Sequence, residues 1–291
     1  MISLGVDVGG TSSKWAVVDN GRLVQTGCAQ PLKKHLFLEA ETHSFENLCR
    51  EIRESMPRLD QVIIGITGVL RATEQQKIAT KVICDVWGIA SEKVLVMSDI
   101  ELNYISQFQD SDGILISAGT GSIAAYRDNS GLITCIGGKG YLIGDEGSGY
   151  WIGAEGIRRS IRFFEEKCND EALGIALKEF YKIDDWREIV EIVYSASGRS
   201  KIASAAKTVI SAATDGSRIA IDIVEQAVGD LARLYEIANR SSISDELRVI
   251  GGVLEVNSPL NLMLARRLNV SLSNRVIKPE IYAAKHGAGH A

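Results

Sequence analysis

The chain has 291 residues, of which 45% are hydrophobic and 24% are charged, and its formal net charge is −5. This balance supports a large core in one or two domains, and without a basic excess it argues against a nucleic-acid or membrane partner. The first residues lack the features of a signal peptide, and charges interrupt every apolar run. We therefore expect a cytoplasmic protein that acts on a small molecule.

The first part of the chain alternates short apolar runs with helical patterns. Two apolar runs, Ile2–Val8 and residues 14–18, flank a glycine-rich turn and predict a β-hairpin. Apolar spacing and β-branched runs then predict, in chain order, a helix over 45–56, a strand over 62–66, a helix over 72–87 and a strand over 94–97 that ends at Ser98-Asp99.

The opening pattern recurs about a hundred residues later, which indicates an internal duplication. Residues 113–117 and 123–126 are apolar and flank a second glycine-rich turn. The later elements are expected to be helices over 151–166, 170–181, 186–196, 201–213 and 218–240, a strand over Leu247–Ile250 and a short helix over 279–291. We predict an α/β protein with an N-terminal lobe at 1–110 and a C-terminal lobe with a helical insertion at 111–291, whose last helix crosses back to the first lobe.

The first turn has the composition of a phosphate-binding loop. Gly9 and Gly10 carry no side chain, so their backbone N–H groups can approach an anion closely. Asp7 precedes the turn, where its carboxylate could hold a Mg²⁺-bound water. A tight hairpin without a ligand is the alternative interpretation. The polar residues of this turn are Thr11, Ser12, Ser13 and Lys14.

Two later segments repeat this composition. A strand that ends in Gly251-Gly252 allows close approach of a flat group such as an adenosine, although by itself such a pair more often marks a tight strand-to-helix connection. Two glycine turns can grip a triphosphate from opposite sides, so the pattern predicts ATP. Neither a Walker A loop nor a Rossmann fingerprint is present. The second turn consists of Gly119, Thr120, Gly121 and Ser122.

Taken in order, these segments resemble the BadF/BadG/BcrA/BcrD ATPase family, and within it the N-acetylglucosamine kinase branch. The resemblance covers essentially the whole chain, and its most specific element is GDEGSGYWIG at 144–153. It implies two ribonuclease-H-like lobes of the actin/hexokinase/Hsp70 type, with ATP bound in the cleft between them. It further implies a kinase that uses ATP and Mg²⁺ and, from family habit, a homodimer.

The resemblance also implies roles for single residues. Asp99 is similar to the catalytic carboxylate of the family, which accepts or orients the substrate hydroxyl, and Asp145 is similar to a ligand of substrate hydroxyls. A strand-ending turn residue and a helix-capping residue are the respective alternatives. The implied ATP contacts are Gly9, Gly10, Thr11, Gly119, Thr120, Gly121, Ser122, Gly251 and Gly252, supplemented by Ser12 and Lys14; Asp7 would serve the metal, and Gly119 would also touch the substrate.

Two departures from the family pattern concern the substrate. Lys139 stands where the N-acetylglucosamine kinases have a tryptophan, and Lys33 lies in a segment where they have an asparagine. Lysines that face a substrate favour an anion, so our first hypothesis is a sugar acid, 2-keto-3-deoxygluconate, with an N-acetylglucosamine or glucosamine kinase as the alternative. The alternative interpretation is that these lysines are solvated surface charges, in which case they say nothing about the substrate.

Two other classes fit the sequence less well. Iron–sulfur activators of radical dehydratases carry a cysteine before the second glycine turn, where this chain has Ser117-Ala118. A non-enzymatic sugar-sensing regulator would lack the catalytic carboxylate, whereas Asp99 is present. An ATP-dependent sugar kinase is therefore the predicted function.

Overall fold

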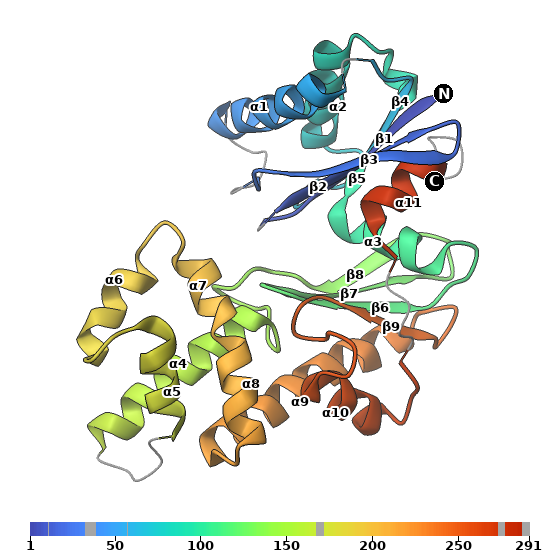
Figure 1. The fold of residues 1–291 in the computed structure, drawn as a ribbon. Coiled ribbons are helices and arrows are strands. Elements are labelled where there is room, and N and C mark those ends of the chain that lie inside the picture. The colour runs from blue at the N-terminus through green and yellow to red at the C-terminus, as the bar shows by residue number, and fades with distance from the viewer. Residues whose placement is uncertain (11, 33–38, 57, 167–171, 273–276, 287–291) are drawn as a thin grey trace. The chain divides into compact units, whose positions relative to one another are not determined.

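The computed structural model describes residues 1–10, 12–32, 39–56, 58–166, 172–272 and 277–286. The chain forms two compact units, one of residues 1–111 together with 275–291 and one of residues 112–274 (Figure 1). The division lies close to the expected boundary at residue 110, and the last helix belongs to the first unit. Across the described ranges, no helix is both long and apolar enough to cross a membrane.

The first unit is built on a five-stranded mixed sheet in the order β3-β2-β1-β4-β5. β1 pairs antiparallel with β2 and parallel with β4, and β5 extends the parallel side. The edge strand β3 is not predicted from the sequence, because most of its residues are exposed and no apolar alternation marks it. The strands are β1 (Ile2–Val8), β2 (Ser13–Asp19), β3 (Arg22–Ala29), β4 (Gln61–Ile66) and β5 (Val94–Ser98).

Helices cover both faces of this sheet (Figure 1). Leu4, Val6 and Val8 of β1 point into a core shared with α1 and α2. The opposite face of the sheet, where Ile63 and Ala16 are buried, packs against α3 and α11. The helices of this unit are α1 (Glu39–Ser55), α2 (Glu74–Trp87), α3 (Asp99–Phe108) and α11 (Pro279–His286).

Gly5 allows α11 to lie directly on β1. A Cβ atom added at Gly5 would come within 2.1 Å of the Glu280 carbonyl oxygen and 2.5 Å of the Ala284 amide nitrogen. These are main-chain atoms, so no side-chain rotation can relieve the overlap. We expect Gly5→Ala to lower the free energy of unfolding by about 3 kcal/mol in urea titrations.

Gly10→Ala is the matched control, because a Cβ at Gly10 meets no atom within 4 Å. Its expected change in the free energy of unfolding is below about 1 kcal/mol. Equal stability of the two variants would contradict the close packing of α11 on β1.

The second unit repeats the strand arrangement of the first. Its sheet has the order β8-β7-β6-β9, with antiparallel pairs except for the parallel pair of β6 and β9. This order matches β3-β2-β1-β4, so the two glycine-rich hairpins occupy equivalent places in the two sheets. The strands are β6 (Ile114–Ala118), β7 (Ser122–Arg127), β8 (Ile133–Gly137) and β9 (Leu247–Ile250).

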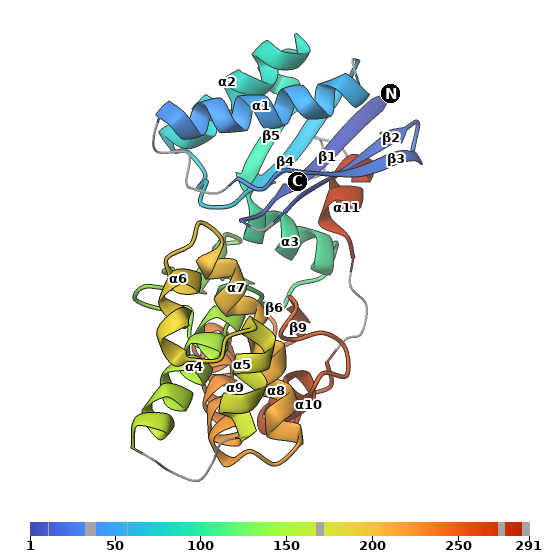
Figure 2. The ribbon, with the colours of Figure 1, turned by 60° about the vertical axis from the view of Figure 1, so that its left-hand side comes forward.

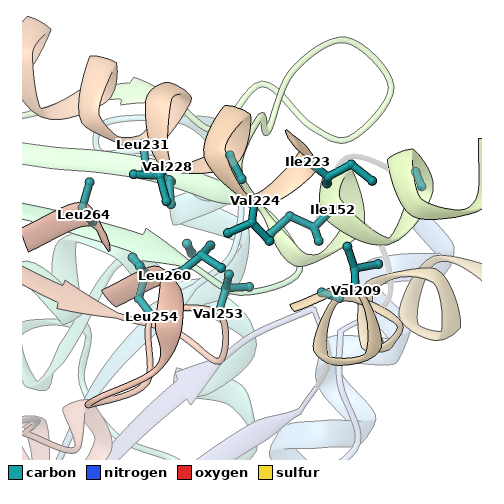
Figure 3. Close-up of a cluster of buried hydrophobic side chains, with 14 of the residues drawn as sticks. Ile152, Val209, Ile223, Val224, Val228, Leu231, Val253, Leu254, Leu260 and Leu264 are labelled. Carbon is teal, nitrogen blue, oxygen red and sulfur yellow. The ribbon is translucent and has the colours of Figure 1, made fainter. Parts of the chain in front are cut away.

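Helices pack on the sheet of the second unit (Figure 2). The buried stripe of α9 includes Val224, Val228 and Leu231, which pack among residues such as Ile152 of α4 and Leu260 of α10 (Figure 3). Two expected helices are interrupted: a short 3₁₀ turn precedes α6, and Ala205 separates α7 from α8. The helices are α4 (Gly149–Glu165), α5 (Ala172–Tyr181), α6 (Ile189–Val193), α7 (Gly198–Ser204), α8 (Ala206–Thr214), α9 (Arg218–Asn239) and α10 (Pro259–Leu268).

Candidate active site

Polar side chains of the first unit gather where its parallel strands end. Asp7 lies near the end of β1, Thr67 follows β4 and Asp99 follows β5. Because these strands are parallel neighbours, their carboxyl ends lie at one edge of the sheet, which is the usual position of ligand sites in such sheets. The topology therefore assembles three oxygen-bearing side chains that are far apart in the sequence.

Asp99 is held in place at the first turn of α3. Ser98 caps this helix by accepting a hydrogen bond from the Glu101 N–H (3.2 Å). The Asp99 Oδ1 atom accepts from the Ile100 N–H at 2.8 Å, and Oδ2 lies 2.7 Å from the Thr67 hydroxyl oxygen. The carboxylate is only partly exposed, so its orientation is fixed while one side remains accessible. Thr67 is a residue that the sequence analysis did not assign to the site.

Asp7 lies in a concentration of negative charge. Burial raises the pKa of Asp7 to about 7, and the nearby carboxylates of Asp99 and Glu280 act in the same direction, whereas Lys14 opposes them. Glu280 is only 5% exposed, and its Oε2 atom has no hydrogen-bond partner among the described residues. This charge is electrostatically unfavourable without a cation.

The first glycine turn is compact. The Gly9 N–H donates to the Ser12 carbonyl oxygen at 3.1 Å, while Gly10 and Ser12 are exposed. Lys14 is also exposed, and it lies opposite Asp7 in the register of β1 and β2. Ser13, by contrast, is buried, and its hydroxyl donates to the Gln30 carbonyl oxygen at 2.9 Å. Thr11 lies outside the described residues.

The second glycine turn is bonded to the start of α4. The Gly149 N–H donates to the Gly119 carbonyl oxygen (2.8 Å), and the Tyr150 N–H donates to the Thr120 carbonyl oxygen (3.4 Å). The Ser122 hydroxyl donates to the Glu146 carbonyl oxygen at 2.7 Å, so its proton is already used within the protein. The most specific sequence segment, 144–153, therefore supports the turn directly.

Gly251 packs against the same turn. Its φ is +104°, and an added Cβ would come within 2.3 Å of the Ala118 carbonyl oxygen and 2.9 Å of the Gly119 amide nitrogen. A side chain is thus excluded there by both conformation and space. The neighbouring Gly252 is exposed. Both glycine motifs predicted for the second unit therefore lie together at the ends of β6 and β9.

Asp145 lies beside the second turn. Its φ of +62° is unusual for a residue other than glycine, and its side chain is buried. The carboxylate accepts from the Gly140 N–H at 3.2 Å, and a Cβ added at Gly121 would lie 2.7 Å from its Oδ2 atom. Burial raises the pKa of Asp145, while the Gly140 hydrogen bond and the charge of Arg199 act in the opposite direction. A strained, buried carboxylate of this kind is typical of a functional position.

The cation near Asp145 is a residue that the sequence analysis missed. The Arg199 guanidinium lies 4.8 Å from the ring centroid of Tyr141, which in turn packs on Tyr150 with centroids 4.7 Å apart. Lys139 is exposed on the preceding loop. Lys33 lies outside the described residues. Arg199 is therefore a cation that acts on Asp145 and that the sequence analysis did not name.

In the described part of the chain, no group of three or more His, Cys, Asp or Glu side chains is arranged to hold a metal ion directly. Asp99 and Glu280 each act electrostatically on Asp7 without forming such a group with it. A cation at this edge would therefore keep much of its water shell, as Mg²⁺ commonly does in nucleotide sites.

Residues 4–288 match the model of the BadF/BadG/BcrA/BcrD ATPase family, and the chain belongs to this family. An N-acetylmuramic acid/N-acetylglucosamine kinase from Clostridium acetobutylicum is 27% identical over 209 residues, which cover 70% of this chain and 67% of that protein. An N-acetyl-D-glucosamine kinase from Dictyostelium discoideum is 24% identical over 310 residues. This match covers 97% of this chain and 96% of that protein.

Solved structures share the fold across the whole chain. A candidate N-acetylglucosamine kinase from Porphyromonas gingivalis has a TM-score of 0.78 at 17% identity, with complete coverage of both chains. A ROK family glucokinase from Streptomyces griseus, solved with glucose and AMPPNP, has a TM-score of 0.56 at 17% identity and 99% coverage of both chains. The predicted two-lobed α/β fold of the actin/hexokinase type is thereby confirmed.

The comparisons also confirm the predicted enzyme class, an ATP-dependent carbohydrate kinase. They do not support 2-keto-3-deoxygluconate as the substrate, and the relatives fit the alternative, an N-acetylhexosamine, better. Lys139 is exposed and Lys33 lies outside the described ranges, so a contact of either lysine with the substrate stays a prediction. The roles of single residues, Mg²⁺ and the homodimer stay predictions.

Proposed function

We propose that this chain transfers the γ-phosphoryl group of ATP to a hydroxyl of N-acetylglucosamine or a closely related N-acetylhexosamine. The observation that carries the proposal is the oriented carboxylate of Asp99, fixed by Thr67 and the Ile100 N–H at the carboxyl ends of parallel strands. The relatives that are named as N-acetylhexosamine kinases support the choice of sugar.

Asp99 would act on the acceptor hydroxyl. Phosphoryl transfer needs an acceptor oxygen aligned with the γ-phosphate and little covalent assistance. A carboxylate that is already oriented by the Ile100 N–H and lies beside the Thr67 hydroxyl can accept a hydrogen bond from the sugar hydroxyl and take its proton as the new P–O bond forms. Its orientation by Thr67 fits this positioning role.

The two glycine turns would bind the phosphates through their backbone. Gly10 is exposed on the first turn, and Gly119 and Gly121 are partly accessible on the second, so main-chain N–H groups can face an anion. Lys14 adds a positive charge beside the first turn. Gly251 packs on the second turn and Gly252 is exposed beside it, where they would flank the nucleoside.

The residues around Asp7 fit a Mg²⁺ ion that accompanies ATP. Asp7 is flanked by two further carboxylates, and one buried oxygen of Glu280 lacks a partner among the described residues. Bound there through Asp7, the ion would neutralise phosphate charge.

A sugar with a carboxylate is a second candidate substrate, and Arg199 favours it. The guanidinium is held on Tyr141 close to Asp145, and Asp145 would accept hydrogen bonds from sugar hydroxyls. A carboxylate on a neighbouring sugar position could pair with Arg199. N-Acetylmuramic acid, named for the Clostridium relative, carries such a group.

The test is acceptor-dependent ADP release from Mg-ATP with N-acetylglucosamine, N-acetylmuramic acid, glucosamine, glucose, 2-keto-3-deoxygluconate and no acceptor. We expect turnover on the N-acetylated sugars. Arg199→Ala should lower kcat/KM for N-acetylmuramic acid by about tenfold or more and change that for N-acetylglucosamine by less than about twofold, because a lost charge-assisted hydrogen bond costs about 1.5–3 kcal/mol.

Lys139→Ala is the control for Arg199→Ala, because it removes an equal charge from the adjacent loop. A selective loss in Lys139→Ala but not in Arg199→Ala would assign the anion contact to the lysine after all. Turnover on 2-keto-3-deoxygluconate alone would overturn the proposed substrate class while keeping the kinase.

A further inference from the structure

Glu280 is a buried carboxylate for which neither the sequence motifs nor the phosphoryl-transfer roles described above provide a function. It lies in the first turn of α11 and is only 5% exposed, yet its Oε2 atom has no hydrogen-bond partner among the described residues. Leaving a charged oxygen buried and unpaired usually costs several kcal/mol. A buried carboxylate oxygen without a partner therefore indicates a bound group that would supply the hydrogen bond.

The packing of α11 places Glu280 next to the Asp7 strand. Because Gly5 has no side chain, the Glu280 carbonyl oxygen lies directly over it. Asp7 is two residues further along β1 and therefore on the same face of the sheet. The carboxylate of Glu280 is close enough to act on Asp7 electrostatically. The missing partner therefore lies on the side of the sheet where Asp7 and Asp99 gather.

The chemistry of that missing partner is that of a hydrated cation. A bare cation held by all three carboxylates is excluded among the described residues, because no such metal-binding group is formed there. Mg²⁺ typically binds one or two carboxylates and keeps several waters, whose O–H groups need acceptors. Residues that accept from such waters commonly change metal affinity by ten- to a hundredfold when mutated.

We propose that Glu280 is a positioning residue of the Mg²⁺ site, where its Oε2 atom accepts a hydrogen bond from a water on an ion held by Asp7. The inference rests on the proposed kinase function and adds α11 to the nucleotide site. The first turn of α11 also carries the partial positive charge of a helix N-terminus, which favours an acidic residue at this position.

The experiment measures ADP affinity by calorimetry, once with Mg²⁺ and once with EDTA. Glu280→Gln keeps the shape of the side chain and removes its charge. It should reduce the Mg²⁺-dependent gain in ADP affinity by about tenfold, while affinity in EDTA stays within about twofold of wild type. The melting temperature in EDTA should rise, because one of the mutually repelling charges near Asp7 is gone.

Asp60→Asn is the matched control. It removes a carboxylate at the other end of β1, where Asp60 accepts from the Ile2 N–H, so it tests whether any lost charge in this unit has the same effect. Its Mg²⁺-dependent gain should equal that of wild type. If Glu280→Gln fails to fold, Glu280→Asp, which keeps the charge on a shorter side chain, should fold and show an intermediate loss.

The outcomes separate the two proposals. A wild-type chain whose ADP affinity ignores Mg²⁺ would overturn the Mg²⁺ site and the role of Glu280 together. A clear Mg²⁺ effect that is unchanged in the foldable Glu280 variant would overturn the role of Glu280 alone. A purely structural role would lower stability in EDTA and leave the Mg²⁺-dependent gain intact.

Discussion

Replacing Asp99 with asparagine is expected to lower kcat for sugar phosphorylation by about a thousandfold. The variant keeps an acceptor oxygen for the Ile100 N–H, and its amide NH2 group can donate to the Thr67 hydroxyl oxygen, so the start of α3 should stay in place. It loses the capacity to take the acceptor's proton. Because this loss arises in the chemical step, KM for the sugar and the affinity for Mg-ADP should change far less than kcat.

Thr67→Val is the companion variant for Asp99→Asn. It removes the hydroxyl that lies 2.7 Å from the Asp99 Oδ2 atom without changing the charge of the site. A loss of orientation alone should cost about tenfold in kcat. An Asp99→Asn enzyme with kcat within about threefold of wild type would show that this carboxylate is not the general base.

The sequence was sufficient to predict the strands that carry the glycine turns. Each of these strands is a short apolar run that Gly, Thr or Asp follows closely, and burial in the sheet explains the apolar run. The strands recognised in this way are β1, β4, β5, β6 and β9. β3 and α3 were not predicted, because β3 is an exposed edge and Asp99 was interpreted as the end of a strand rather than as the first residue of a helix. Local pattern thus predicts the buried strands of a sheet better than its exposed edge strand, and it can miss a buried helix that directly follows a strand.

The partners within the site could not be predicted from local pattern. Thr67 meets Asp99 only because β4 and β5 are parallel neighbours. Glu280 resembles an ordinary acidic residue at a helix start until its burial is seen, and Arg199 is an exposed arginine until its contact with Tyr141 is seen. These contacts depend on tertiary packing, whereas the glycine turns are encoded in consecutive residues.

The same packing buries Asp7 among other carboxylates, which lowers the free energy of unfolding. The Asp7→Asn variant should show by how much. The pKa of Asp7 is about 7 in the folded protein and 3.8 ordinarily, so folding favours the protonated form. The resulting stability is fully present below about pH 4 and is lost as the pH rises towards 7. In EDTA, wild type should therefore lose stability relative to Asp7→Asn across this range, and the loss should reach about 4 kcal/mol by pH 8.

Urea unfolding in EDTA at pH 5, 6, 7 and 8 measures this difference. Asp85→Asn, at an exposed position on α2, should change the free energy of unfolding by less than about 0.5 kcal/mol at each pH. Mg-ADP should stabilise wild type but not Asp7→Asn, because the ion that offsets the negative charge is then absent. A constant difference between wild type and Asp7→Asn at all pH values would mean that Asp7 is ionised without strain, and the charge around it would need another explanation.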